Sequence, residues 1–111
     1  MKILISGSRA ITEFDLSAYI PGETDLIISG GANGIDRLAE QYADKNKISK
    51  LVLRPDYRRF GKAAPIIRNK QMVDIADGVV VIWDGKSSGS KNTADYAKKQ
   101  GKLLTLVNLN T

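Results

Sequence analysis

The residues of this sequence best suited to chemistry form a run of small side chains, Ser29-Gly30-Gly31-Ala32-Asn33-Gly34-Ile35-Asp36. Small side chains let a backbone approach a ligand closely. The helical spacing that follows predicts a helix whose free N–H groups and positive dipole end face the same place. We therefore expect this run to bind an anion or a nucleotide. Asn33 as the helix cap and Asp36 as a first-turn acid are alternative interpretations.

The run from Ser29 to Asp36 does not match the common phosphate-binding motifs. No Gly-Lys-Ser/Thr follows it, so it is not a P-loop, and it lacks the G-x-G-x-x-G spacing of dinucleotide-binding proteins. The expectation of anion binding therefore depends on small residues before a helix.

Two other short segments offer groups of the same kind. Gly7-Ser8-Arg9 combines a residue that permits a sharp turn, a hydroxyl, and a guanidinium suited to phosphate or carboxylate. Ser88-Gly89-Ser90 follows Asp84 and opens another predicted helix, with Ser90 or Asn92 as its cap. Two small-residue loops that each open a helix predict an anion site better than one does.

Basic residues cluster further along the chain. The run Arg54-Pro55-Asp56-Tyr57-Arg58-Arg59-Phe60-Gly61-Lys62 carries two aromatic rings and can stack a base and hold phosphates, although such runs are more often solvated loops. Arg68 and Asn69 lie on an otherwise apolar helical segment. They can face a ligand, but a lone Arg68 would more simply extend its charged end to solvent.

The elements that must position these residues begin with five continuous apolar runs. Runs of this kind, rich in Ile, Leu and Val, predict strands buried on both faces, as in a parallel sheet. The expected strands are Lys2–Ser6, Asp25–Ser29, Lys50–Leu53, Gly78–Trp83 and Leu103–Val107.

Helical patterns separate the predicted strands. The strongest is the apolar stripe from Ile35 to Ala43, and a second lies within 61–76, beginning near Ala63 or Ala64 because Pro65 fits only a first turn. We also expect helices at Asn92–Gln100 and, as a short first helix, at Glu13–Ile20. This alternation predicts an α/β fold with a five-stranded parallel sheet and helices on both faces. Ligands bind such sheets at the carboxyl ends of the strands.

Composition narrows the chemistry further. The 111 residues are enough for one domain, 1–111, and they include no cysteine and no histidine. Thiolate chemistry, the usual neutral-pH base and the commonest metal ligand are therefore missing, and we expect no metal and no cofactor. The formal net charge of +5 fits a phosphate-bearing partner, either a small nucleotide or DNA. No segment reads as a signal peptide or membrane span, so we expect a cytoplasmic protein without a membrane partner.

These motifs, in this order, resemble the SLOG superfamily of Rossmann-like domains, and most closely its small single-domain YspA-like family. The matching segments are Gly7-Ser8-Arg9, Ser29-Gly30-Gly31-Ala32-x-Gly34-Ile35-Asp36, Arg68-Asn69-x-x-Met72, Asp77 before an apolar strand, and Ser88-Gly89-Ser90. The superfamily also includes the DNA-uptake protein DprA and the LOG-type phosphoribohydrolases that activate cytokinins. The resemblance implies a three-layer αβα sandwich that binds a nucleotide or a nucleotide-derived ligand.

The resemblance assigns expected ligand contacts residue by residue. The expected ligand-binding residues are Gly7, Ser8, Arg9, Ser29, Gly30, Gly31, Ala32, Gly34, Asp36, Arg68, Asn69, Asp84, Ser88, Gly89 and Ser90. The last loop departs from the enzymes in two ways: the Pro-Gly-Gly of LOG-type proteins is absent, and Thr93 stands where they carry the glutamate that assists N-glycosidic cleavage. Arg68, Asp84 and Asp36 remain as candidate catalytic residues.

Three functions stay open from the sequence. The first is a nucleotide-binding or sensing module with little chemistry. It is favoured because the chain has no histidine and no cysteine and lacks the glutamate of the LOG-type enzymes at position 93. The second is a phosphoribohydrolase that releases the base from a nucleoside 5′-monophosphate. The third is DprA-like binding of single-stranded DNA through the basic run at 54–62. Because a small chain gains core by association, and because relatives often dimerise, we also expect a homodimer.

Overall fold

A computed structural model describes residues 1–109 of the chain, and its centre is a parallel sheet. The strands are β1 (Lys2–Gly7), β2 (Leu26–Ser29), β3 (Ser49–Val52), β4 (Gly78–Trp83) and β5 (Leu103–Asn108). Their order across the sheet is β3-β2-β1-β4-β5, and every neighbouring pair is parallel. Each predicted strand is present, with bounds that differ from the predicted ones by one residue or so.

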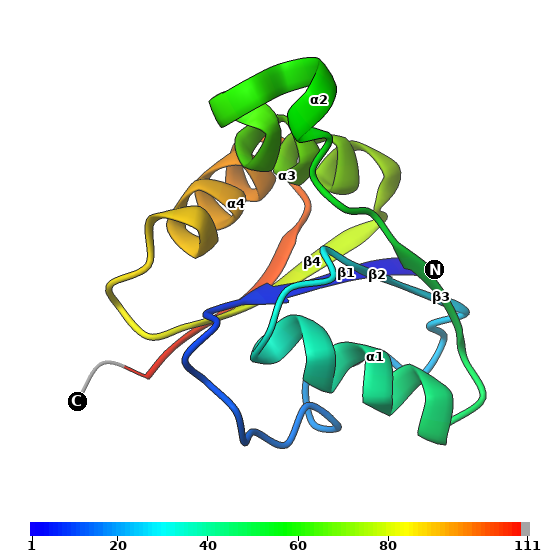
Figure 1. The fold of residues 1–111 in the computed structure, drawn as a ribbon. Coiled ribbons are helices and arrows are strands. Elements are labelled where there is room, and N and C mark those ends of the chain that lie inside the picture. The colour runs from blue at the N-terminus through cyan, green and yellow to red at the C-terminus, as the bar shows by residue number, and fades with distance from the viewer. Residues whose placement is uncertain (110–111) are drawn as a thin grey trace.

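Helices cover both faces of the sheet, as Figure 1 shows. Helix α1 (Ile35–Lys45) packs on one face, and α3 (Ala64–Ile75) and α4 (Ser88–Lys99) pack on the other. A short helix α2 (Tyr57–Phe60) and a 3₁₀ turn (Gly61–Ala63) lead into α3. The fold is the predicted Rossmann-like three-layer αβα sandwich.

The core lies in two layers, one on each side of the central strands. Alternate β1 residues point to opposite faces, so Ile3 and Ile5 pack with α1 while Leu4 packs with α3 and α4. All three side chains are fully buried, as expected of a central strand in a doubly covered sheet. This packing fixes the position, relative to the helices, at which β1 ends and its loop begins.

The order of the strands in the sheet reverses at β1: β2 and β3 lie on one side of it, and β4 and β5 lie on the other. The segment after β1 packs on the α1 face through Leu16, whereas β4 leads into α4 on the opposite face. Loops that leave two adjacent parallel strands toward opposite faces open a crevice at the carboxyl ends of those strands. Gly7 and Ile82 are paired at this end of the sheet, so the crevice begins there.

The predicted helix at Glu13–Ile20 is wrong, because this segment forms turns without a helix. The carboxylate of Asp15 accepts hydrogen bonds from the Ser17 backbone N–H at 3.0 Å and from its hydroxyl at 2.6 Å. Such local side-chain bonds compete with helical hydrogen bonds. Phe14 and Tyr19 stack at 5.6 Å between ring centroids, which gives the turn its own packing.

Two other boundaries differ from prediction. Helix α4 begins at Ser88 rather than at Asn92, and Ser87 is its cap residue. Part of the basic run that we interpreted as a loop is helical, because the Asp56 side chain caps α2 by accepting from the Arg59 N–H at 3.1 Å. No helix within residues 1–109 is both long and apolar enough to cross a membrane.

Candidate functional site

Two neighbouring cavities open at the carboxyl ends of the strands. Cavity A, of about 380 Å³, lies beside the loop after β2 and is lined by Arg9, Gly30, Gly31, Ala32, Asn33, Arg54, Pro55, Tyr57 and Arg68. Cavity B, of about 470 Å³, lies over the ends of β1 and β4, and its lining includes residues 84 and 87–90. Arg9, Ala32 and Arg68 line both cavities, and we call these three residues the shared wall.

The backbone of the small-residue run is already hydrogen-bonded within the chain. The Gly31 N–H donates to the Ser29 hydroxyl, and the Ala32 N–H donates to the Asp36 carboxylate, each at 3.1 Å. Our expectation of free amides at this turn therefore fails for these two groups. Ser29 is itself fully buried, donates to Glu40 at 2.8 Å, and lines neither cavity.

The glycines of this region allow close packing between backbone segments. A Cβ at Gly34 would overlap the carbonyls of Ser8 and Arg9, and its φ of +73° favours glycine. A Cβ at Gly7 would overlap the Ile82 carbonyl and the side chain of Ile35. These contacts bring the start of α1 against β1 and its loop. Gly34, rather than Asn33, is the cap residue of α1, and it lies outside cavities A and B.

Arg68 holds the loop after β2 to the end of β3. Its Nη1 donates to the Gly30 carbonyl at 2.7 Å and to the Leu53 carbonyl at 3.3 Å, and its Nε donates to Asn69 at 2.9 Å. The side chain is only 8% exposed, so it does not extend to solvent. Burial lowers the pKa of Arg68, Asp36 opposes that shift, and Arg9 adds to it.

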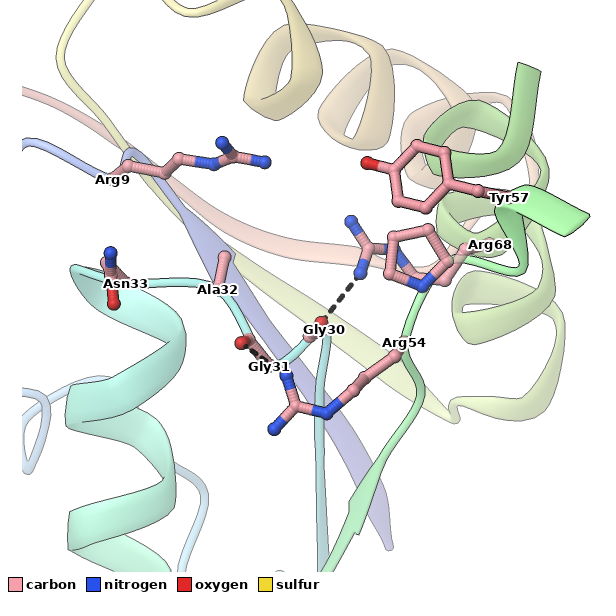
Figure 2. Close-up of a pocket in the computed structure, with 9 residues that line it drawn as sticks. Arg9, Gly30, Gly31, Ala32, Asn33, Arg54, Tyr57 and Arg68 are labelled. Atoms are coloured by element: carbon pink, nitrogen blue, oxygen red, sulfur yellow. Dashed lines mark hydrogen bonds between the residues drawn. The ribbon is translucent and has the colours of Figure 1, made fainter. Parts of the chain in front are cut away.

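One end of the Arg68 guanidinium remains available. Its Nη2 makes no hydrogen bond within residues 1–109, and Figure 2 shows this nitrogen pointing away from Gly30, toward the space between Arg9 and Tyr57. The Arg9 side chain also lacks a hydrogen bond or ion pair in the described part of the chain and extends over Ala32 toward the same space. Two positive groups therefore face one gap, which favours an anion between them.

Asn69 faces cavity B with an unused donor. Its side-chain oxygen accepts from Arg68, while its Nδ2 has no hydrogen-bond partner among residues 1–109. The residue is 9% exposed, and no side-chain nitrogen or oxygen sealed from solvent in residues 1–109 lacks a partner, so Nδ2 reaches the cavity. A buried side chain with an unused donor at a cavity is suited to a ligand.

Two aspartates line cavity B and differ in their acidity. Burial raises the pKa of Asp36 above 3.8, although the Ala32 N–H and Arg68 favour its charged form. The N–H groups of Ser87 and Lys86 lower the pKa of Asp84 to about 2. Asp84 is therefore ionised at neutral pH, and one oxygen of each carboxylate has no partner within residues 1–109.

Ser8 joins the two loops that frame cavity B. Its hydroxyl bonds with that of Ser87 at 2.6 Å and accepts from the Asp84 N–H at 3.0 Å. Ser8 is 1% exposed, so its main role in this structure is to fix the loops.

The start of α4 leaves its amides free at cavity B. No side chain caps this helix, and the N–H groups of its first three residues make no hydrogen bond with described residues. These residues, Ser88, Gly89 and Ser90, line cavity B. Free amides at a helix start attract negative or hydroxyl oxygens, so α4 supplies what we expected from α1.

The structure adds residues that the expected ligand contacts did not include. Tyr57 and Pro55 supply ring surface to cavity A beside Arg54, whose Nη1 donates to the Gly31 carbonyl at 3.0 Å. The two aromatics of the basic run were the available signal. Thr93, at the position of the LOG glutamate, is buried and donates its hydroxyl to the Gly89 carbonyl at 3.1 Å. No group of three metal-ligating side chains forms in the described part of the chain.

The site can therefore be described by what each part offers. Cavity A offers rings, the shared wall offers two guanidinium groups, and cavity B offers hydroxyls, amides and carboxylates.

Comparison with curated proteins and with solved structures found no match. The profile of one family, described as YAcAr, the YspA, cpYpsA-related SLOG family, matches residues 1–60, which hold β1, the small-residue run and Tyr57. This match covers more than half of the 111 residues, and the chain belongs to that SLOG family.

Proposed function

We propose that this domain binds a nucleotide or a nucleotide-derived ligand across cavities A and B, with a phosphate between Arg9 and Arg68. The observation that carries the proposal is the pair of guanidinium groups at the shared wall with unused donors. Arginine presents a planar set of donors that suits phosphate oxygens. Family membership supports a nucleotide-related ligand in general.

Electrostatics explains why the phosphate belongs at the shared wall. Arg9 and Arg68 repel each other, and Arg68 has lost much of its hydration. Asp36 offsets part of that charge but forms no ion pair within 4.0 Å with either arginine. A bound phosphate would replace the missing hydration and relieve the repulsion.

Cavity A suits the base of such a ligand. Tyr57 is 57% exposed, and its ring lies above Arg68 and Arg54 in Figure 2; Pro55 lines the same cavity. Bases stack on aromatic rings and on guanidinium planes, a contact worth about 1–3 kcal/mol per base. Stacking is tolerant of base identity, so this wall supports nucleotide binding without choosing the base.

Calorimetric titration with nucleoside mono-, di- and triphosphates and their derivatives tests the proposal. We expect at least one nucleotide to bind, and Arg9→Ala to weaken it by about 10- to 100-fold, since a hydrogen bond to a charged group is worth about 1.5–3 kcal/mol. Arg58→Ala is the matched control, because Arg58 is exposed and lines neither cavity. Absence of binding across the panel, or equal losses in both variants, contradicts the proposal.

Hydrolysis of a nucleoside monophosphate is a second candidate, favoured by one observation. Asp36 is a buried carboxyl with a raised pKa at cavity B, a condition suited to donating a proton to a leaving base. Asp84 is too acidic for that role. Chromatography of reaction mixtures tests it: release of free base that stops in Asp36→Asn supports hydrolysis, and unchanged nucleotide after prolonged incubation supports binding alone.

A further inference from the structure

The two cavities meet at the same pair of arginines, Arg9 and Arg68. Each has a volume, about 380 and 470 Å³, within the range that ligand-sized groups occupy in proteins. Because Arg9 and Arg68 line both, an anion held there occupies the middle of the site rather than one end. A ligand that fills the site then needs a group on each side of its phosphates.

Cavity B is poorly suited to a terminal phosphate as that second group. Asp36 and Asp84 both line this cavity, each has a carboxylate oxygen without a partner within residues 1–109, and Asp84 is ionised at neutral pH. A phosphate dianion placed against the ionised Asp84 carboxylate would be repelled. The start of α4 alone would attract such an anion, but the charge of Asp84 opposes it.

A group rich in hydroxyls matches cavity B better. Hydroxyl groups both donate and accept, so they satisfy carboxylate oxygens and unused N–H groups together. The unused donors are the Nδ2 of Asn69, which belongs to a side chain only 9% exposed, and the amides of Ser88 to Ser90 at the start of α4. Cavity B therefore presents both the acceptors and the donors that bind the hydroxyl groups of a sugar.

We infer that the ligand is a nucleoside diphosphate esterified to a second sugar. Its base lies in cavity A, its two phosphates lie between Arg9 and Arg68, and the second sugar lies in cavity B. Two phosphate charges match the two guanidinium groups of the shared wall. This inference rests on the proposed function, and it adds that the phosphates are internal to the ligand rather than terminal.

Matched pairs of ligands test this inference directly. We would titrate the protein with ADP and ADP-glucose, GDP and GDP-mannose, and UDP and UDP-glucose, which within each pair differ by the second sugar. For the base that binds, we expect the sugar nucleotide to bind about tenfold more tightly, the value of two or three modest hydrogen bonds. Equal affinity, or tighter binding of the free diphosphate, overturns the inference while leaving nucleotide binding intact. No binding by any of the six overturns the inference, whereas the proposed function fails only if the wider panel of nucleotides also shows no binding.

Asp84→Asn tests the role of cavity B. The asparagine oxygen can replace Oδ1 as acceptor of the Lys86 and Ser87 N–H groups, while the free oxygen becomes a donor and the charge is lost. We expect the advantage of the sugar nucleotide to shrink and the free diphosphate to bind as well or better. If Asp84→Asn does not fold, Ser88→Ala serves as the second variant. It removes an exposed hydroxyl that has no partner in residues 1–109, and it should shrink the same advantage. An unchanged affinity ratio in the folded variants overturns the inference.

Discussion

At the scale of single residues, Arg68 combines a structural and a binding role. Nε and Nη1 join three parts of the chain, while Nη2 remains free at the shared wall. Arg9, across the gap, makes no such bonds in the described part of the chain and so contributes only charge and donors. The two arginines should therefore differ in their effect on folding.

Arg68→Ala should lower the free energy of unfolding by roughly 1.5–3 kcal/mol, the value of hydrogen bonds to a charged group. It leaves the Gly30 carbonyl unpaired and Asp36 without its main compensating charge. Arg9→Ala should change stability by less than about 0.5 kcal/mol, as for other exposed positions. Urea denaturation of both variants checks this prediction, and similar losses in the two would contradict it.

Asp84 makes stability depend on pH in the acid range. Because the pKa of Asp84 is lowered from 3.8 to about 2, its ionised form stabilises the fold above pH 3.8, and this contribution disappears as the pH falls toward 2. Asp84→Asn should therefore be less stable than the wild type at pH 6, and the difference should shrink below pH 4. Denaturation midpoints measured from pH 2 to 6 test this, and a difference independent of pH would count against it.

At the scale of elements, glycines in two loops have different functions although both loops appear equivalent in the sequence. Gly34 has a positive φ and touches the backbone of the β1 loop, so it joins α1 to β1. Gly89 lies in the first turn of α4, with open space where a Cβ would be. The loop at Gly34 therefore allows close packing of backbone segments, whereas the loop at Gly89 leaves its backbone amides available to a ligand.

The pair Gly34→Ala and Gly89→Ala tests this distinction. Gly34→Ala should cost about 2–4 kcal/mol, from backbone strain and overlap with two carbonyls. Gly89→Ala should stabilise the protein by up to about 1 kcal/mol, because alanine is the better helix former and meets nothing there. Thermal or urea unfolding distinguishes the two, and equal losses would refute the assignment.

The sequence predicts the elements better than it predicts which groups are free. Apolar runs such as Gly78–Trp83 identify buried strands because a doubly covered sheet requires them. Glu13–Ile20 fails because Asp15 bonds locally to Ser17, a choice that periodicity does not reveal. The amides of Gly31 and Ala32 are occupied by Ser29 and Asp36, and that arrangement depends on the packing of α1 against β2.

At the scale of the whole molecule, the parallel strand order places both cavities at the carboxyl ends of the strands. The resulting site draws on four loops: those after β1, β2 and β4, and the segment from β3 to α3. A ligand that contacts all four joins the two sides of the sandwich. Binding should therefore stabilise the entire fold rather than one segment.

Ligand at 100 times its dissociation constant should raise the free energy of unfolding by about 2.7 kcal/mol, the value expected for a ligand that binds only the folded state. Unfolding should remain a single transition, because the contacts span both helical layers. Arg9→Ala should need a correspondingly higher ligand concentration. A rise confined to one of two separate transitions would argue against a site shared by the whole fold.

The central claim is that an anionic ligand sits between Arg9 and Arg68 and extends into both cavities. A ¹⁵N NMR titration that records backbone amides and arginine side chains tests it most directly. We expect the largest shifts at the Arg9 and Arg68 guanidinium groups, with further shifts at Tyr57 and at the Ser88 to Ser90 amides. Unchanged arginine signals, with shifts gathered instead at the groove between α4 and β5 near Leu106, would contradict the claim.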